Sequence, residues 1–211
     1  LGVHLLNGVE SIDDGVGNHE LGHNFGLLHA NYWDCGDESL GLACGSVEYG
    51  DNFDTMGGAR NKGHYNAPHK ELISWLEPSN ILEVSPTDEE VTYTIEGYET
   101  YSQGVQAIDI PYNGPYGEGG EHYYLEYRRP IGYDSIAADD FGSDVHDGLM
   151  IHFHHYYGTG DTQILDNQPT NDAYVIDAQN VVLKEGETFA DEVNGIRIRV
   201  EDMNEESIDV V

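Results

Sequence analysis

The segment His19-Glu-Leu-Gly-His23-Asn-Phe-Gly26-Leu-Leu-His29 decides how the N-terminal part of this chain folds. We expect a helix over about residues 15–27, on which His19 and His23, four residues apart, project from the same face. Apolar residues recur at helical spacing on another side of this helix: Leu21, Phe25 and Leu28. A helix with an apolar flank and a histidine flank is predicted to lie buried between layers.

The histidines of this segment form a candidate metal site. His19 and His23 can bind one ion from a single helix face. A continuing helix would carry His29 away from that ion, but Gly26 can adopt a left-handed conformation that ends the helix and turns the chain back. Three neutral nitrogens leave the fourth position of a zinc ion open, which is the pattern of a catalytic zinc site.

Glu20 follows the first histidine and has a different expected role. From this position its carboxylate can reach a water on the ion without being a ligand itself. Zinc lowers the pKa of such a water towards neutrality. Glu20 can then act as the general base and later deliver the proton to a leaving amine.

The 211-residue chain is strongly acidic: 8 Lys plus Arg against 40 Asp plus Glu give a formal net charge of −32. Nucleic acids and anionic membranes require a cationic surface, so this charge argues against both as partners. No stretch is apolar for long enough to span a bilayer. The simplest interpretation of the acidic residues is a solubilising surface. Calcium is a second candidate ion, for a cluster that matches no calcium-loop signature: Asp139, Asp140, Asp144 and Asp147.

Cys35 and Cys44 are the two cysteines of the chain, and they lie nine residues apart. In an exported protein we expect them to form a disulfide that closes a small loop. Two free thiols, or two ligands of another metal, are the alternatives.

Two further groups contain histidines. One member of the first group can stabilise a tetrahedral oxyanion, although a packing role is favoured: His64, Tyr65 and His69. The second group is a conceivable second metal site, although a solvated strand face is favoured: His152, His154 and His155.

The chain is predicted to have an α+β fold in two parts, a zinc-binding portion at about residues 1–80 and a β-rich module at 81–211. In the first part we expect a short strand within residues 1–12, an ordered loop over 30–66 and a second helix over 67–75. In the second part, alternating segments separated by turn residues are typical of an antiparallel sandwich-like module. The predicted strands are 91–95, 105–110, 122–127, 149–153, 181–183, 196–200 and 208–211.

Residues 19–29 resemble the extended zinc motif of the metzincin metalloproteases. In that clan a methionine turn lies downstream and forms a hydrophobic floor under the ligands. Asp54-Thr-Met56-Gly57 stands at the corresponding place, with Met56 27 residues after His29. Some metzincins have a tyrosine two residues after this methionine, whereas here the residue is Gly58.

Within the clan, the chain is most similar to the gametolysin-like peptidases and their bacterial relatives. The similarity extends over residues 19–30, Glu48-Tyr-Gly-Asp51, Tyr65-Asn-Ala-Pro-His-Lys70 and Tyr124-Leu-Glu-Tyr-Arg-Arg-Pro130. Metzincins carry a twisted sheet and a long helix before the zinc helix. Only 18 residues precede His19 here, so we expect the N-terminal sheet to be truncated.

The resemblance implies a secreted zinc metalloendopeptidase that hydrolyses internal peptide bonds of protein or peptide substrates. It implies Glu20 as the catalytic residue, Met56 as the floor, and these metal ligands: His19, His23 and His29. One alternative is a binding or adhesion module with a vestigial zinc site, in which the β-rich half does the binding. Another is a zinc hydrolase of non-peptide amides or esters. The sequence does not predict an oligomeric state.

Overall fold

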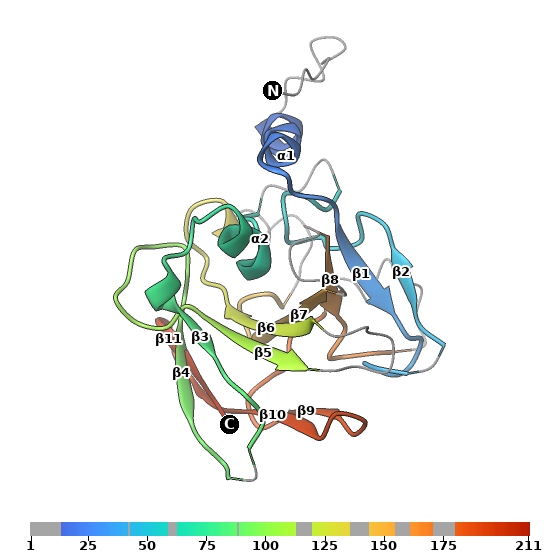
Figure 1. The fold of residues 1–211 in the computed structure, drawn as a ribbon, viewed down its shortest axis with the longest axis vertical. Coiled ribbons are helices and arrows are strands. Elements are labelled where there is room, and N and C mark those ends of the chain that lie inside the picture. The colour runs from blue at the N-terminus through green and yellow to red at the C-terminus, as the bar shows by residue number, and fades with distance from the viewer. Residues whose placement is uncertain are drawn as a thin grey trace.

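The computed structural model describes residues 14–41, 43–58, 63–87, 89–112, 120–135, 144–154, 161–170 and 180–211. These residues have an α+β fold in which sheets predominate, with helices α1 and α2 towards the top of Figure 1. The predicted fold class is confirmed at this level.

Within the described residues, the larger sheet has seven strands in the order β2-β1-β8-β7-β6-β5-β3. Neighbouring strands are antiparallel, except that β1 with β8 and β3 with β5 are parallel. Strands from both sides of residue 80 therefore share this sheet, and the division of the chain at that residue stays a prediction. The strands are β1 (Ala30–Asp34), β2 (Gly45–Val47), β3 (Ile81–Glu83), β5 (Ala107–Tyr112), β6 (Glu121–Tyr127), β7 (Leu149–His154) and β8 (Thr162–Leu165).

A smaller antiparallel sheet lies at the end of the molecule opposite α1, in the order β4-β11-β10-β9 (Figure 1). Its strands are β4 (Tyr93–Glu96), β9 (Thr188–Asp191), β10 (Ile196–Met203) and β11 (Ser207–Val210). Alternate residues of both sheets, such as Ile151 and Ile208, form the main apolar core between them. Because successive strand residues face opposite sides, the other face of the larger sheet carries buried polar side chains such as Glu126 and His152.

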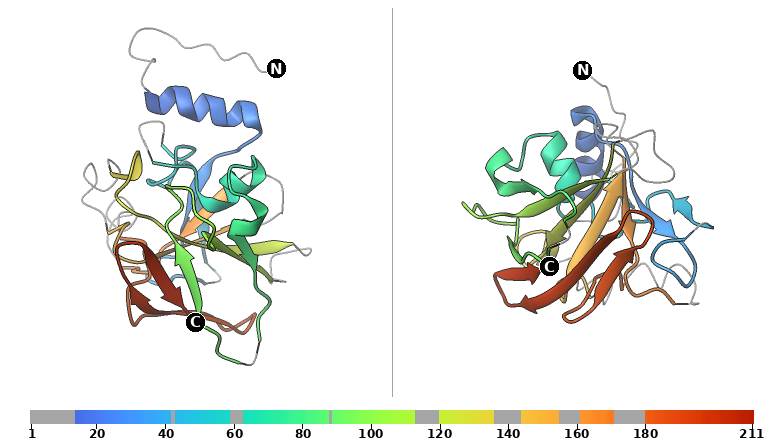
Figure 2. Two further views of the ribbon diagram at one scale, coloured as in Figure 1. Left: turned by 90° about the vertical axis from the view of Figure 1, so that its left-hand side faces the viewer. Right: turned by 60° about the horizontal axis from the view of Figure 1, so that its bottom comes forward.

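Helix α1 (Asp14–Phe25) crosses the top of the molecule, and α2 (Ala67–Leu72) lies below it in the left-hand view of Figure 2. Both helices were predicted, and both end earlier than expected. In α2 the Asn66 side chain caps the first turn by accepting a hydrogen bond from the His69 N–H (3.0 Å). The chain leaves the helix at Ser74, whose φ of 60° is left-handed.

The expectation that α1 is buried between layers is wrong for its apolar flank. Leu21, Phe25 and Leu28 are 44%, 47% and 48% exposed. Phe25 contacts the exposed ring of Trp75 edge-on, with the ring centroids 5.8 Å apart. The buried contacts of α1 with the described part of the chain lie on the side that carries His19 and Gly22, against Met56 and Tyr65.

The prediction of one long loop over residues 30–66 is also wrong, because β1 and β2 lie within it. Other segments cover both faces of β1: Ala30 packs with Met56, and Asn31 accepts a hydrogen bond from the Tyr49 N–H. Consecutive residues Ala30, Asn31 and Tyr32 are therefore all buried, and no alternation appears in the sequence. Strands β3, β8 and β9 were not predicted, and the expected strand at residues 181–183 forms only a bridge between Leu183 and Leu149. The strand expected within residues 1–12 lies outside the described residues.

The predicted disulfide is confirmed: Cys35 and Cys44 are bonded, with their Cα atoms 4.1 Å apart. They close the connection between β1 and β2. No helix in the described ranges has the length and apolar character needed to cross a bilayer.

A buried charged network joins the larger sheet to the segments above it. Arg128 Nη2 lies 2.8 Å from Glu126 Oε1, and His152 Nε2 lies 3.0 Å from Asp51 Oδ2. Glu126 also accepts a hydrogen bond from the Ala67 N–H at the start of α2. All four charged side chains are fully buried, so they fix α2 and the loop around residue 51 onto the sheet.

Replacing Glu126 with Gln is expected to lower the free energy of unfolding by about 3–5 kcal/mol. The change removes the nearer of two carboxylates that pair with the buried guanidinium of Arg128, and leaves Asp134 Oδ1, 3.6 Å from Arg128 Nη1, as the other. Denaturant unfolding followed by circular dichroism measures this difference. Glu83→Gln on the edge strand β3 of the same sheet, where the side chain is exposed, is the matched control and should change stability little.

The effect of Glu126→Gln should also depend on pH. Burial alone favours the neutral acid, but Arg128, His152 and the Ala67 amide together lower the pKa of Glu126 below its usual value of 4.5. The ionised side chain therefore contributes stability above pH 4.5, and this contribution is lost as pH falls through the folded-state pKa. A difference between wild type and variant that stays constant from pH 7 to pH 3 would contradict this account.

Candidate metal centre

His19, His23 and His29 come together beside the C-terminal half of α1. Their ligand atoms all lie within 4.8 Å of one another. Among the described residues, this is the one group of three or more His, Cys, Asp or Glu side chains placed so closely. His19 is buried whereas His23 and His29 are partly exposed, so the group opens towards solvent on one side.

Gly26 ends α1 and directs the chain back to the first two histidines. Its φ is 96°, its N–H donates to the His23 carbonyl (3.1 Å), and the Leu27 N–H donates to the Gly22 carbonyl (3.1 Å). These two bonds are those of a Schellman motif, which needs a left-handed residue at this place. The predicted role of Gly26 is therefore confirmed. The Thr162 N–H then donates to the His29 carbonyl (3.3 Å), which fixes the third histidine beside β8.

Each of the three imidazoles is held through its Nδ1 atom. His19 Nδ1 lies 2.9 Å from the Thr55 carbonyl, and His23 Nδ1 lies 2.8 Å from the Leu27 carbonyl. His29 Nδ1 lies 2.8 Å from Glu48 Oε1. Carbonyl and carboxylate oxygens only accept hydrogen bonds, so each Nδ1 atom acts as the donor, and a neutral imidazole in this arrangement offers its Nε2 lone pair to a metal.

This donor set fits a divalent transition metal. Three neutral imidazole nitrogens suit zinc and leave room for a further ligand. Hydrogen bonds from the second ring nitrogen to an oxygen acceptor are the usual way in which metal-binding histidines are oriented. The geometry supports a metal site, and it does not distinguish zinc from other ions that prefer imidazole.

The turn at residues 54–57 lies directly against α1. The Gly57 N–H donates to the Asp54 carbonyl (3.0 Å), which closes the turn, and its Thr55 carbonyl is the acceptor for His19. Met56 is fully buried and packs with Leu27. A Cβ built on Gly22 would lie 2.2 Å from the Met56 sulfur, so a side chain at this position of α1 would displace the methionine.

Asp54 holds this turn in place. Its carboxylate accepts hydrogen bonds from the N–H groups of Met56 and Asn66, and from His69 Nδ1 (3.1 Å). His69 therefore has a structural role beneath the turn. Tyr65 also has a structural role, since its hydroxyl donates to the Asn18 carbonyl of α1 (2.7 Å).

Glu20 lies one residue after His19 on α1 and is half-buried. Burial is the largest influence on His19 and lowers the pKa of its imidazole, and the neighbouring His23 and His29 lower it further. Glu20 acts in the opposite direction, so its carboxylate lies within electrostatic range of the triad. The net lowering keeps His19 neutral near pH 7, the state in which it can bind a metal.

Among the residues that the structure describes, the other histidine and carboxylate candidates do not assemble into a second site. His152 is fully buried against Asp51, and His154 stacks on His122 with centroids 5.4 Å apart. Asp144 lies 3.2 Å from Lys184 Nζ. His155 and two of the predicted calcium ligands, Asp139 and Asp140, lie outside the described residues.

Sequence reasoning did not assign roles to Glu48 or Tyr49. Both precede the turn that contains Met56, in a segment noted above only for its similarity to a family. Glu48 could have been found from the requirement that the second nitrogen of each ligand needs an acceptor. Tyr49 had no such signal, because its ring contacts with His29 and His19 depend on how the β1–β2 hairpin folds back.

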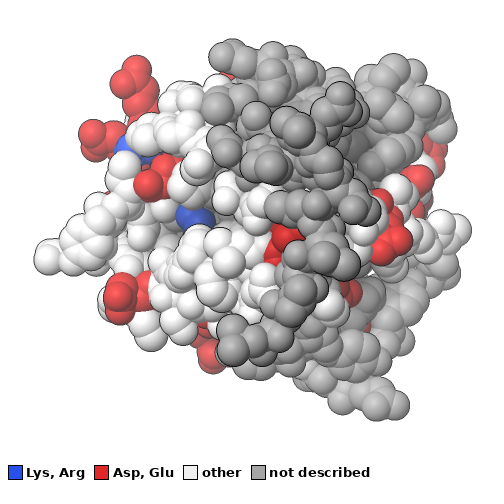
Figure 3. Space-filling view, turned by 90° about the horizontal axis from the view of Figure 1, so that it is seen from above, with Lys and Arg blue, Asp and Glu red and all other residues white. Residues whose placement is uncertain are grey.

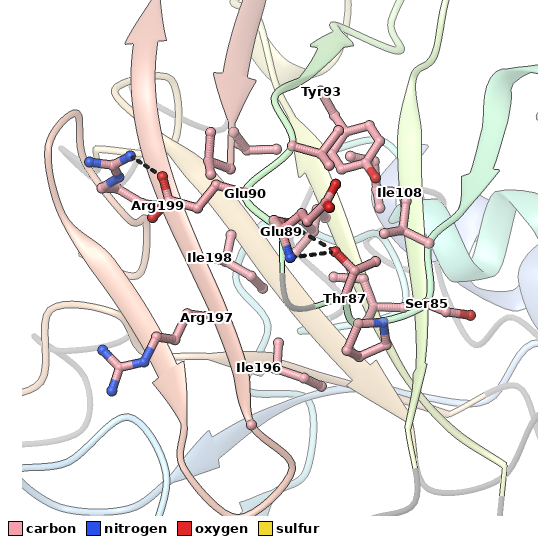
Figure 4. A pocket seen from close by; sticks show the side chains of 18 of the residues that line it. Ser85, Thr87, Glu89, Glu90, Tyr93, Ile108, Ile196, Arg197, Ile198 and Arg199 are labelled. Carbon is pink, nitrogen blue, oxygen red and sulfur yellow. Dashed lines mark hydrogen bonds and ion pairs between the residues drawn. The ribbon is translucent and has the colours of Figure 1, made fainter.

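A separate cavity of about 450 Å³ lies between the two sheets, at the end opposite α1. Figure 4 shows Ile108, Ile196 and Ile198 lining it beside the connection from β3 to β4. Glu89 and Glu90 are exposed at this connection.

On the face seen from above in Figure 3, acidic side chains are more numerous than basic ones among the coloured residues.

In comparisons with known proteins, no family model, no curated protein and no solved structure matches the chain.

Removing the Glu48 carboxylate is expected to weaken metal binding by about 10–100-fold, because His29 loses the acceptor that orients it. Glu48→Ala should show the full effect. Glu48→Gln should show less, since an amide oxygen can still accept from Nδ1. Competition for zinc against a chromophoric chelator measures the affinity. Exposed Glu77→Ala is the control, and equal affinities for Glu48→Ala and Glu77→Ala would exclude the proposed role of Glu48.

Proposed function

We propose that this chain carries the metal centre of a secreted, metzincin-type zinc endopeptidase that hydrolyses internal bonds of protein or peptide substrates. The observation that carries the proposal is the convergence of three oriented imidazoles next to the half-buried carboxylate of Glu20. A purely structural zinc site has a fourth protein ligand. Within the described residues, the triad has no fourth His, Cys, Asp or Glu at ligand distance.

The residues of the site divide into three roles. His19, His23 and His29 hold the ion. When bound there, zinc would supply a water of lowered pKa and a Lewis acid for the scissile carbonyl. Glu20 would accept a proton from the attacking water and donate it to the amine nitrogen as the C–N bond breaks. Met56 supports the triad from below, through the close contact of α1 at Gly22.

The disulfide between Cys35 and Cys44 supports the proposal of an exported protein, since disulfides persist in oxidising compartments. It closes the hairpin that leads to Glu48, the residue that orients His29. The same oxidising environment that maintains the bond would therefore help to maintain the metal site.

Glu20→Gln tests the catalytic role. The amide keeps the size of the side chain and cannot accept the proton of the water, so turnover of casein is expected to fall at least about 10²-fold. The variant should retain about one zinc per chain by elemental analysis, because Glu20 is not a ligand. Glu77→Gln, the same change at an exposed carboxylate outside α1, is the surface control. A Glu20→Gln variant that cleaves casein as fast as wild type would end the proposal.

A second candidate function is that of a binding module, and the cavity between the sheets is the observation that favours it. Its floor consists of buried apolar residues: Ile108, Ile110, Leu125, Ile196 and Ile198. Arg199 at its edge is paired with Glu201 (2.7 Å), so its charge is already compensated. With Glu89 and Glu90 exposed nearby and a chain charge of −32, the cavity suits a neutral or cationic apolar molecule.

The cavity is tested with the uncharged dye N-phenyl-1-naphthylamine, whose emission shifts to the blue in apolar surroundings. Saturable binding is expected for wild type. Val84→Trp should remove it, because Val84 lines the cavity and the larger ring fills it. Val193→Trp is the control, since Val193 is 73% exposed. If the dye binds neither wild type nor the control, the binding-module alternative loses its support.

A further inference from the structure

Tyr49 places its ring on two of the three histidines. Its centroid lies 3.9 Å from that of His29 with the ring planes 35° apart, and 5.9 Å from that of His19 with the planes 30° apart. The side chain remains 41% exposed, so burial in a core does not explain where it lies. The ring therefore covers one side of the metal centre.

The backbone of Tyr49 adopts a conformation that tyrosine rarely takes. Its φ is 62°, in the left-handed region that favours glycine. Ser74, with a φ of 60°, is the other non-glycine residue with positive φ in the described part of the chain. Strained residues of this kind persist where the surrounding structure fixes them, and they cluster at functional sites.

Two hydrogen bonds hold Tyr49 in this conformation. Its N–H donates to Asn31 Oδ1 (3.0 Å), and the Gly50 N–H donates to the Val47 carbonyl (3.0 Å), which closes the turn. Asn31 is buried in β1, two residues after His29. The same strand therefore positions the third histidine and the backbone of the residue that packs on it.

Tyr49 and Glu48 act on different parts of the same imidazole. Glu48 holds the Nδ1 edge of His29, whereas Tyr49 contacts the ring itself.

We propose that Tyr49 is a positioning residue of the metal centre, whose ring holds His29 in the orientation in which it binds the ion. His29 needs this support because, unlike His19 and His23, it does not belong to α1. The inference rests on the proposed function only in requiring that the triad binds a metal, and it makes no claim about peptide cleavage.

Tyr49→Gly separates support of the metal from support of the fold. Glycine accepts a φ of 62° without strain, so the melting temperature of the metal-free protein should stay the same or rise. Zinc affinity, measured by competition with a chromophoric chelator, should fall about tenfold or more. Tyr49→Phe keeps the ring and should restore the wild-type affinity. Ser74→Gly makes the same backbone change away from the triad and should leave the affinity unchanged.

The absorption spectrum of the cobalt-substituted protein gives a second test, because it would not change if Tyr49 only contributed to packing. The visible absorption bands of bound Co²⁺ depend on ligand geometry, so they should change in Tyr49→Gly and match wild type in Tyr49→Phe and Ser74→Gly. Wild-type zinc affinity in Tyr49→Gly, or a metal-free Tyr49→Gly protein that no longer folds, overturns the proposal. A wild-type protein that binds zinc and cuts no peptide would count against the proposed function and leave this inference intact.

Discussion

The candidate metal centre depends on hydrogen bonds that fix the three imidazoles of His19, His23 and His29 through their Nδ1 atoms. The acceptors come from different places: the Thr55 carbonyl in the turn below α1, the Leu27 carbonyl after the helix end, and the carboxylate of Glu48. A histidine without such an acceptor can rotate and can change tautomer, which costs metal affinity. The helix supplies two histidines at the right spacing, but the loops decide whether all three point at one ion.

Those loops must themselves be rigid, and the larger sheet provides the rigidity. Asp54 holds the turn under α1 and is linked to α2 through His69 and the Asn66 N–H. Asp51 lies in the same segment and pairs with His152 of β7. Buried charges of this kind are costly unless every partner is present, so the segment has few alternative positions. The larger sheet therefore fixes the segment that holds the three histidines, although these histidines lie outside the sheet.

Sequence reasoning found the parts of this site that depend on local spacing. His19, His23 and the helix end at Gly26 follow from helical geometry, and the approach of His29 follows from the turn. It did not predict a strand at residues 30–34, because both faces of β1 are covered at its start and its residues show no alternation. It also missed Tyr49, since the contact of the turn after β2 with His29 depends on long-range packing. The metal-ligand candidates could be predicted from local spacing, whereas Tyr49, which packs on them, could not.

The acidic composition has two opposing effects on such a site. A net charge of −32 attracts divalent cations, but nearby carboxylates such as Glu20 also favour protonated imidazole, which cannot bind them. For His19, burial between α1 and the turn at Thr55 outweighs this effect and lowers the pKa of the imidazole. At 0.1 M salt, the attraction between charges more than about 10 Å apart is largely screened. Salt hardly changes the desolvation of a buried imidazole ring. Local burial and hydrogen bonding would therefore set most of the affinity for a metal ion at the triad, and the surface charge would govern how fast ions arrive.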